Sequence, residues 1–170
     1  DREQILLLLR GIDFWREHWR RTQTQGVILN AGGIVAYYHP SDFPLTWYAE
    51  RLGGRDLFGE LVEAARKDGL AVFARMDSNR VHEPFFVEHP DWMAVDAQGK
   101  PYMIGGLYVT CIDSPYYGEY LPAVLKEIAR RYHPDGFTDN SWTGGDRDHI
   151  SYSIHARRRF REATGLDLPK

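Results

Sequence analysis

Short runs of apolar residues alternate with amphipathic helical segments along this chain, and this alternation constrains the fold more than any other feature. Asp56 is a good N-cap for a helix that ends at Gly69, and Ser114 with Pro115 begins a later helix. Apolar strands joined by helices form a parallel sheet that is covered on both faces. The sequence therefore predicts an α/β fold with four parallel strands, at residues 27–29, 70–74, 107–111 and 136–138.

The segments between these strands carry their own local signals. They predict a helix over residues 2–22 with a possible break at Gly11, a short helix over 82–90, a hairpin over 92–104 that turns at 96–99, and a final helix over 150–164.

The number of strand–helix units bears on the architecture. No glycine-rich phosphate loop follows any of the strands, which disfavours an open nucleotide-binding sheet and favours a barrel. A TIM-type (β/α)8 barrel needs eight units and typically about 250 residues, whereas this chain has 170 residues and four units. We therefore expect residues 1–170 to be a single (β/α)4 unit, the N-terminal half of such a barrel and part of a larger catalytic domain. Because the two outer strands of a half-barrel have unpaired edges, we expect it to associate with a second copy or with the remainder of a longer chain.

Composition excludes several classes of function. The 21 Lys and Arg residues against 24 Asp and Glu residues give a net charge of −3, which disfavours binding to nucleic acid. The longest apolar run, residues 5–9, is too short to cross a membrane. The single cysteine, Cys111, excludes an internal disulfide and is expected to be an inert core thiol. We expect no metal and no cofactor.

Polar side chains gather where the predicted strands end. Ligand sites of parallel α/β proteins lie at the carboxyl ends of the strands. The residues found there are Asn30, Arg75, Asp77, Asn79, Asp113, Asp139 and Asn140.

Asp139 is the strongest catalytic candidate among them. Cleavage of a glycosidic bond needs one carboxylate at the oxocarbenium-like centre and a second carboxyl group to protonate the leaving oxygen. Asp139 is followed by Asn140 and, two residues later, by Trp142, whose ring suits the apolar face of a sugar. The alternative is that Asp139 caps the next loop or pairs with an arginine.

Other residues have both a binding and a structural interpretation. Arg75 and Asp77 either bind substrate hydroxyls or form an ion pair, and Asn30 follows the first strand at the same edge. Tyr38, in the aromatic run that comes next, either stacks on a sugar or packs within its loop. His82, His89 and Asp91 could be metal ligands, but the run HPDW at 89–92 fits the end of a helix better than a metal site.

Several motifs along the chain resemble a known family when taken as a set. They are AGGIVAYY at 31–38, DLFG at 56–59, RMD at 75–77, HPDW at 89–92, CIDSPYY at 111–117 and DGFTDNSW at 135–142. Together they resemble a group of bacterial glycoside hydrolases, the hypothetical glycosyl hydrolases, which are allied to α-L-fucosidases and some β-galactosidases. The resemblance implies a (β/α)8 barrel and a carbohydrate substrate. It also implies a retaining mechanism in which Asp139, at the end of a fourth strand, is the nucleophile and the acid/base comes from a later part of the barrel.

One stretch departs from that family. Its members carry Cys-Tyr-Cys-x-x-Cys after the fourth strand, and this chain has Ser151, Ser153 and Ala156 at the three cysteine positions. The sequence leaves two further functions open. One is a non-catalytic carbohydrate-binding or half-barrel assembly module, because no second catalytic carboxyl group is assignable. The other is a metal-dependent hydrolase, which the lack of His-x-His after the first strand disfavours.

Overall fold

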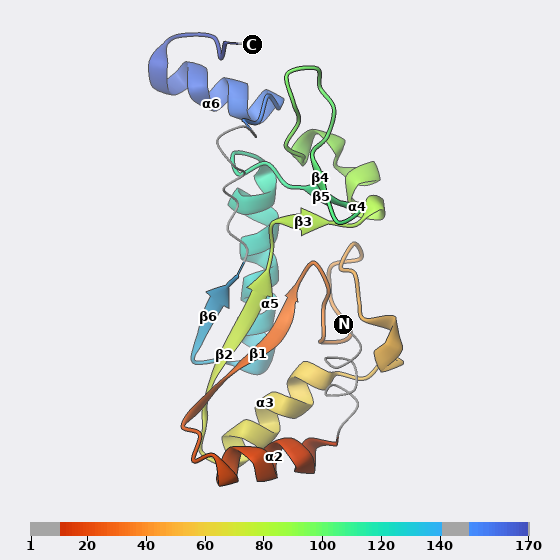
Figure 1. Cartoon of the computed structure of the whole chain (residues 1–170), viewed down its shortest axis with the longest axis vertical. Coiled ribbons are helices and arrows are strands. Elements are labelled where there is room, and N and C mark those ends of the chain that lie inside the picture. The colour runs from red at the N-terminus through yellow and green to blue at the C-terminus, as the bar shows by residue number, and fades with distance from the viewer. Residues whose placement is uncertain (1–10, 141–149, 170) are drawn as a thin grey trace.

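The computed structural model describes residues 11–140 and 150–169, which form an elongated α/β structure (Figure 1). The elements are α2 (Ile12–Arg21), β1 (Gly26–Gly33), η1 (Glu50–Leu52), α3 (Leu57–Lys67), β2 (Ala71–Asp77), β3 (Arg80–Val81), α4 (Glu83–Glu88), η2 (Pro90–Trp92), β4 (Met103–Ile104), β5 (Leu107–Val109), η3 (Tyr116–Tyr120), α5 (Leu121–Tyr132), β6 (Gly136–Asp139) and α6 (Ile154–Thr164). Part of the predicted helix over 2–22, together with Trp142, lies outside the described residues.

A parallel sheet with the strand order β1-β2-β6 organises the structure, which confirms the predicted α/β class. Val72, Ala74 and Met76 of β2 are buried on one face of the sheet. The apolar residues of α3 and α5 pack against this face, and Phe58 and Ile128 are fully buried in the shared core. In Figure 1 the three strands run side by side and end in the same direction, so their carboxyl ends share one edge.

The helix that follows β1 begins and ends where the sequence predicts. The carboxylate of Asp56 caps α3 by accepting a hydrogen bond from the backbone N of Gly59 at 3.0 Å. The same side chain accepts a 2.8 Å bond from the hydroxyl of Tyr132, on α5. Asp56 thus fixes the start of one helix and ties it to the other helix that covers the sheet.

The prediction of a parallel strand at 107–111 is wrong. β5 pairs antiparallel with both β3 and β4 in a separate sheet, of order β3-β5-β4. The cause is the two-residue turn Gly105–Gly106, whose φ angles of +60° and +80° suit a tight hairpin. The hairpin predicted around residues 96–99 does form, with a bridge between Val95 and Pro101. Among the described residues the parallel sheet has three strands rather than four, and Asp139 ends the third.

The second face of the parallel sheet is open. Ile28 of β1 and Phe73 of β2 are register partners on this face, and they are 63% and 38% exposed. The expectation of helices on both faces is therefore wrong for the part of the chain described here. The strand order also leaves β1 and β6 at the edges, as the sequence predicts.

The final helix caps the end of the molecule that lies beyond the strand ends (Figure 1). The hydroxyl of Ser153 accepts a hydrogen bond from the backbone N of Ala156, so α6 starts at Ile154, four residues later than predicted. It ends at Gly165 as expected. Within residues 11–140 and 150–169, no helix has the length and apolar character to span a membrane.

Candidate functional site

Three of the predicted site residues meet on the open face of the sheet, near its carboxyl edge. Asn30 of β1 is the register partner of Arg75 of β2, so both side chains lie on the same face. The guanidinium Nη2 of Arg75 lies 3.4 Å from Oδ1 of Asp77, and both side chains are 36% exposed. The Nε atom of Arg75 is buried and has no hydrogen-bond partner in the described structure. This cluster combines a carboxylate, an amide and a guanidinium group.

Asp139 occupies a different part of the same edge. It is the last residue of β6 and the register partner of Met76. Its side chain therefore lies on the face of the sheet that α3 and α5 cover, and not on the open face that carries Arg75. The buried hydroxyl of Ser78 donates a hydrogen bond to Oδ2 of Asp139. Asn140 is exposed, and its backbone N donates to the carbonyl of Met76 at 3.1 Å. The structure therefore separates Asp139 from the cluster of Asn30, Arg75 and Asp77.

Two tyrosines of η3, the helical turn directly before α5, lie near Asp139. Tyr116 is fully buried, and burial raises its pKa well above the usual value. The hydroxyl of Tyr117 lies 3.0 Å from Oγ1 of Thr110, and burial together with the charge of Asp139 raises the pKa of Tyr117 to about 12. Both phenols are therefore neutral near physiological pH. Sequence reasoning missed Ser78 and Tyr117, although Ser78 directly follows a predicted site residue.

The aromatic loop after β1 contributes a different tyrosine from the predicted one. Tyr38 is only 1% exposed and donates a 2.8 Å hydrogen bond to Glu127, so its ring is a core side chain and not a platform for a sugar. Its neighbour Tyr37 is half-buried. Burial, and after it the carboxylate of Asp77, raise the pKa of Tyr37.

A stacked pair of rings lies next to the end of β2. The rings of Trp47 and His82 are 4.1 Å apart and nearly parallel, and Trp47 is 39% exposed. His82 is hydrogen-bonded to the backbone of Ile34, whose own N donates to the carbonyl of Asp77 at 2.6 Å. Burial lowers the pKa of His82, and its Nε2 atom is buried without a partner in the described structure. Trp47 is a third residue that sequence reasoning missed.

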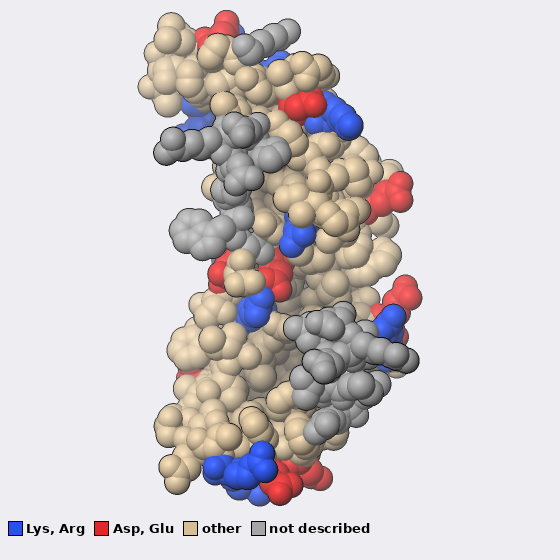
Figure 2. All heavy atoms as spheres, in the orientation of Figure 1, with Lys and Arg blue, Asp and Glu red and all other residues tan. Residues whose placement is uncertain are grey.

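The face shown in Figure 2 carries acidic and basic side chains next to each other around a hollow, at the level where the strands end in Figure 1. The described residues contain no group of three or more His, Cys, Asp or Glu side chains placed to hold a metal ion. The chemical groups at this edge are carboxylates, a guanidinium, amides and aromatic rings.

The chain is thus an α/β protein with a parallel sheet, a class in which ligand sites lie at the carboxyl ends of the strands. More particularly, the chain belongs to the family described as Hypothetical glycosyl hydrolase 6, which matches residues 16–141. The resemblance carried by the sequence motifs is thereby confirmed. No curated protein matches the chain.

Solved structures of glycosidases share the fold. An α-L-fucosidase, isoenzyme 2 from Paenibacillus thiaminolyticus, superposes with a TM-score of 0.70 at 22% identity, over 94% of this chain and 24% of the fucosidase. A β-galactosidase from the psychrophilic Marinomonas ef1 gives a TM-score of 0.59 at 21% identity, over 88% of this chain and 23% of the galactosidase. A hypothetical protein from Ruminiclostridium thermocellum gives 0.57 at 15% identity, over 93% of this chain and 86% of that protein. The chain thus spans about a quarter of the length of the two enzymes.

Proposed function

We propose that this chain forms part of the catalytic domain of a retaining glycoside hydrolase, with Asp139 as the nucleophile. The observation that carries the proposal is the carboxyl edge of a parallel sheet, where Asp139 ends β6 on the face that the helices cover and Asn30, Arg75 and Asp77 lie on the open face. Membership of a glycosyl hydrolase family and the shared fold of two glycosidases support it.

The open sheet supports a half-barrel as the architecture. Ile28 and Phe73 are exposed on a face that would line the interior of a closed barrel. Complete burial of such a side chain contributes about 1.5–3 kcal/mol, so closure of the barrel stabilises the fold. β1 and β6 both have an edge at which further strands can pair. These strands come from a longer chain or from a second copy.

In the proposed reaction the carboxylate of Asp139 attacks the anomeric carbon of a bound sugar. The bond from that carbon to the leaving oxygen breaks, and an acid from the remainder of the barrel protonates this oxygen. Water then attacks the anomeric carbon, the bond from this carbon to Asp139 breaks and frees its carboxylate, and the residue that acted as the acid now accepts the proton of the water. Ser78 holds the carboxylate in position through its hydrogen bond to Oδ2. Arg75, Asp77, Asn30 and Asn140 bind hydroxyl groups, and Trp142 stacks on the sugar.

The test is hydrolysis of a panel of aryl glycosides by the protein that contains this chain. Asp139→Asn should lower turnover by at least a thousandfold, because loss of a member of a catalytic set commonly costs several powers of ten. Azide or formate should restore part of this activity by replacing the missing carboxylate. Asp13→Asn, the same change at an exposed position on α2, is the matched control and should leave activity unchanged.

Two results would overturn the proposal. One is an Asp139→Asn variant whose activity stays within tenfold of the wild type. The other is a wild-type protein that binds sugars and hydrolyses no member of the panel, which would support the non-catalytic carbohydrate-binding module instead.

A further inference from the structure

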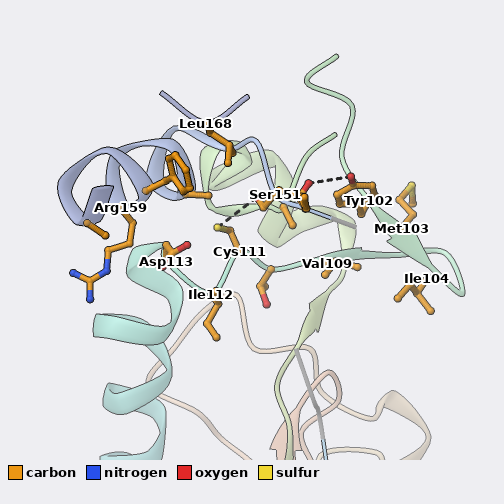
Figure 3. A pocket seen from close by; sticks show the side chains of 16 residues that line it. Tyr102, Met103, Ile104, Val109, Cys111, Ile112, Asp113, Ser151, Arg159 and Leu168 are labelled. Carbon is orange, nitrogen blue, oxygen red and sulfur yellow. Dashed lines mark hydrogen bonds between the residues drawn. The ribbon is translucent and has the colours of Figure 1, made fainter. Parts of the chain in front are cut away.

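A cavity of about 540 Å³ lies between the β4–β5 hairpin and α6, beyond the carboxyl ends of the strands (Figure 3). Its volume falls in the range of about 300–1,000 Å³ typical of small-molecule sites. The mechanism proposed above uses none of the side chains that line it. Asp139, Arg75 and Asp77 are not among those lining residues.

The walls of this cavity are fixed to one another by hydrogen bonds. The hydroxyl of Ser153, at the start of α6, donates to the sulfur of Cys111 at 3.1 Å. The hydroxyl of Tyr102, next to β4, donates to the carbonyl of Ile150 at 3.1 Å. The backbone N of Tyr152 donates to the carbonyl of Val95 at 2.8 Å. The hairpin, the segment around Cys111 and the final helix therefore form one unit around the cavity.

Large apolar side chains line the cavity and yet are exposed to water. Met103 is 51% exposed, Ile104 is 54%, Ile112 is 60% and Ile150 is 51%. Isolated exposed apolar residues are common, but several around one cavity mark a binding site. Polar side chains also line the cavity, namely Tyr102, Thr110, Asp113, Ser151 and Arg159, but most of the lining residues are apolar. Its chemistry suits an apolar group.

Hydrogen bonds of residues 78–79 and Thr110 connect the cavity to the region of Asp139. Thr110, which lines the cavity, has its hydroxyl 3.0 Å from the hydroxyl of Tyr117. The hydroxyl of Thr110 also donates to the carbonyl of Asn79 at 3.1 Å, and the neighbouring Ser78 donates to the carboxylate of Asp139. A molecule whose sugar sits at Asp139 can therefore place its other end in the cavity.

We propose that this cavity binds the aglycone of the substrate, and that the aglycone is an apolar aryl-sized group. The inference rests on the proposed function and deepens it, because it names the class of substrate as glycosides of apolar alcohols or phenols. Contact with Ile112 and its apolar neighbours provides the affinity, and the sugar end makes the polar contacts at the strand ends.

The test compares two exposed isoleucines. Ile112→Ser removes an apolar side chain that lines the cavity, whereas Ile154→Ser is a matched control, since Ile154 is 68% exposed and lies outside the lining. Binding of 4-nitrophenol, which carries no sugar, is measured by isothermal titration calorimetry. We expect about tenfold weaker binding in Ile112→Ser and unchanged binding in Ile154→Ser. Failure of the wild type to bind, or equal binding by both variants, would overturn the inference.

Kinetics separate this inference from the proposed function. The ratio of kcat/KM for a 4-nitrophenyl glycoside to that for the methyl glycoside of the same sugar should fall about tenfold in Ile112→Ser only. An unchanged ratio with active enzyme overturns the aglycone assignment and leaves the proposed function intact. If 4-nitrophenol binds through Ile112 while no glycoside is hydrolysed, the proposed function fails and the cavity remains a site for an aryl group.

Discussion

The buried carboxylate of Glu127 on α5 holds the loop that follows β1, and its removal should have a large effect on stability. Its side chain is 2% exposed and accepts hydrogen bonds from the hydroxyls of Tyr38 at 2.8 Å and Ser41 at 2.9 Å. It also accepts a bond from the backbone N of Asp42 at 2.6 Å, and Arg131 lies 3.4 Å away. Hydrogen bonds to a charged group contribute about 1.5–3 kcal/mol each, and breaking a buried pair costs about 3–5 kcal/mol. We expect Glu127→Ala to lower the free energy of unfolding by about 3–5 kcal/mol.

Urea denaturation followed by circular dichroism measures this loss. Glu63→Ala is the matched control, because Glu63 is also a helical glutamate with an i,i+4 partner, Lys67, at 2.7 Å. Its side chain is 69% exposed, and such surface pairs contribute about 0.3–0.5 kcal/mol. A loss below about 1 kcal/mol for Glu127→Ala, or equal losses in both variants, would refute the view that this carboxylate anchors the loop.

Three further predictions concern the strand-end region. Burial lowers the folded-state pKa of His82 below the unfolded value of about 6.5. The stability that its neutral ring provides is therefore present above that pH and is lost as the pH falls below it. Urea titrations at pH 8 and pH 5 should show this loss of stability, and the loss should be smaller in His82→Gln. The pKa of Tyr117 is raised to about 12 from about 10, so its contribution to stability is complete below pH 10 and is lost as the pH rises through 12. Absorbance at 295 nm should show several late-ionising tyrosines, and Tyr117→Phe should remove one of them. Gly33 has a φ of +101°, and a Cβ added there would overlap the backbone of Asp77. Gly33→Ala should therefore lower the free energy of unfolding by more than about 2 kcal/mol. Gly32→Ala is the control and should lower it by much less, because a Cβ there would meet only an ordinary 3.4 Å contact with the side chain of Met76.

Local signals in the sequence were sufficient for the elements that depend on local physics. The Asp56 cap, the end of α3 before Gly69 and the short strand at β6 all lie where side-chain capping, glycine and apolar runs predict them. The sequence also predicts which residues lie at the carboxyl edge of the sheet, because parallel strands end together. These residues are Asn30, Arg75, Asp77 and Asp139.

Pairing and burial could not be predicted in the same way. An apolar run such as residues 107–111 does not specify its partner strand, and the Gly105–Gly106 turn assigned it to an antiparallel hairpin. The choice between Tyr37 and Tyr38 depends on Glu127, which lies 89 residues away from Tyr38 in the chain. The side of the sheet that Asp139 occupies depends on its register with Met76. Each of these facts comes from a long-range contact that no short motif encodes.

Covalent trapping tests the central claim most directly. The protein that contains this chain is incubated with the 2-deoxy-2-fluoro aryl glycoside of the sugar that it hydrolyses, and the modified peptide is sequenced by mass spectrometry. A retaining mechanism with this nucleophile predicts one fluoroglycosyl group attached to the carboxylate of Asp139. A label on any other residue, or turnover of the parent glycoside with inversion and no labelled peptide, would contradict the assignment of Asp139 as the nucleophile.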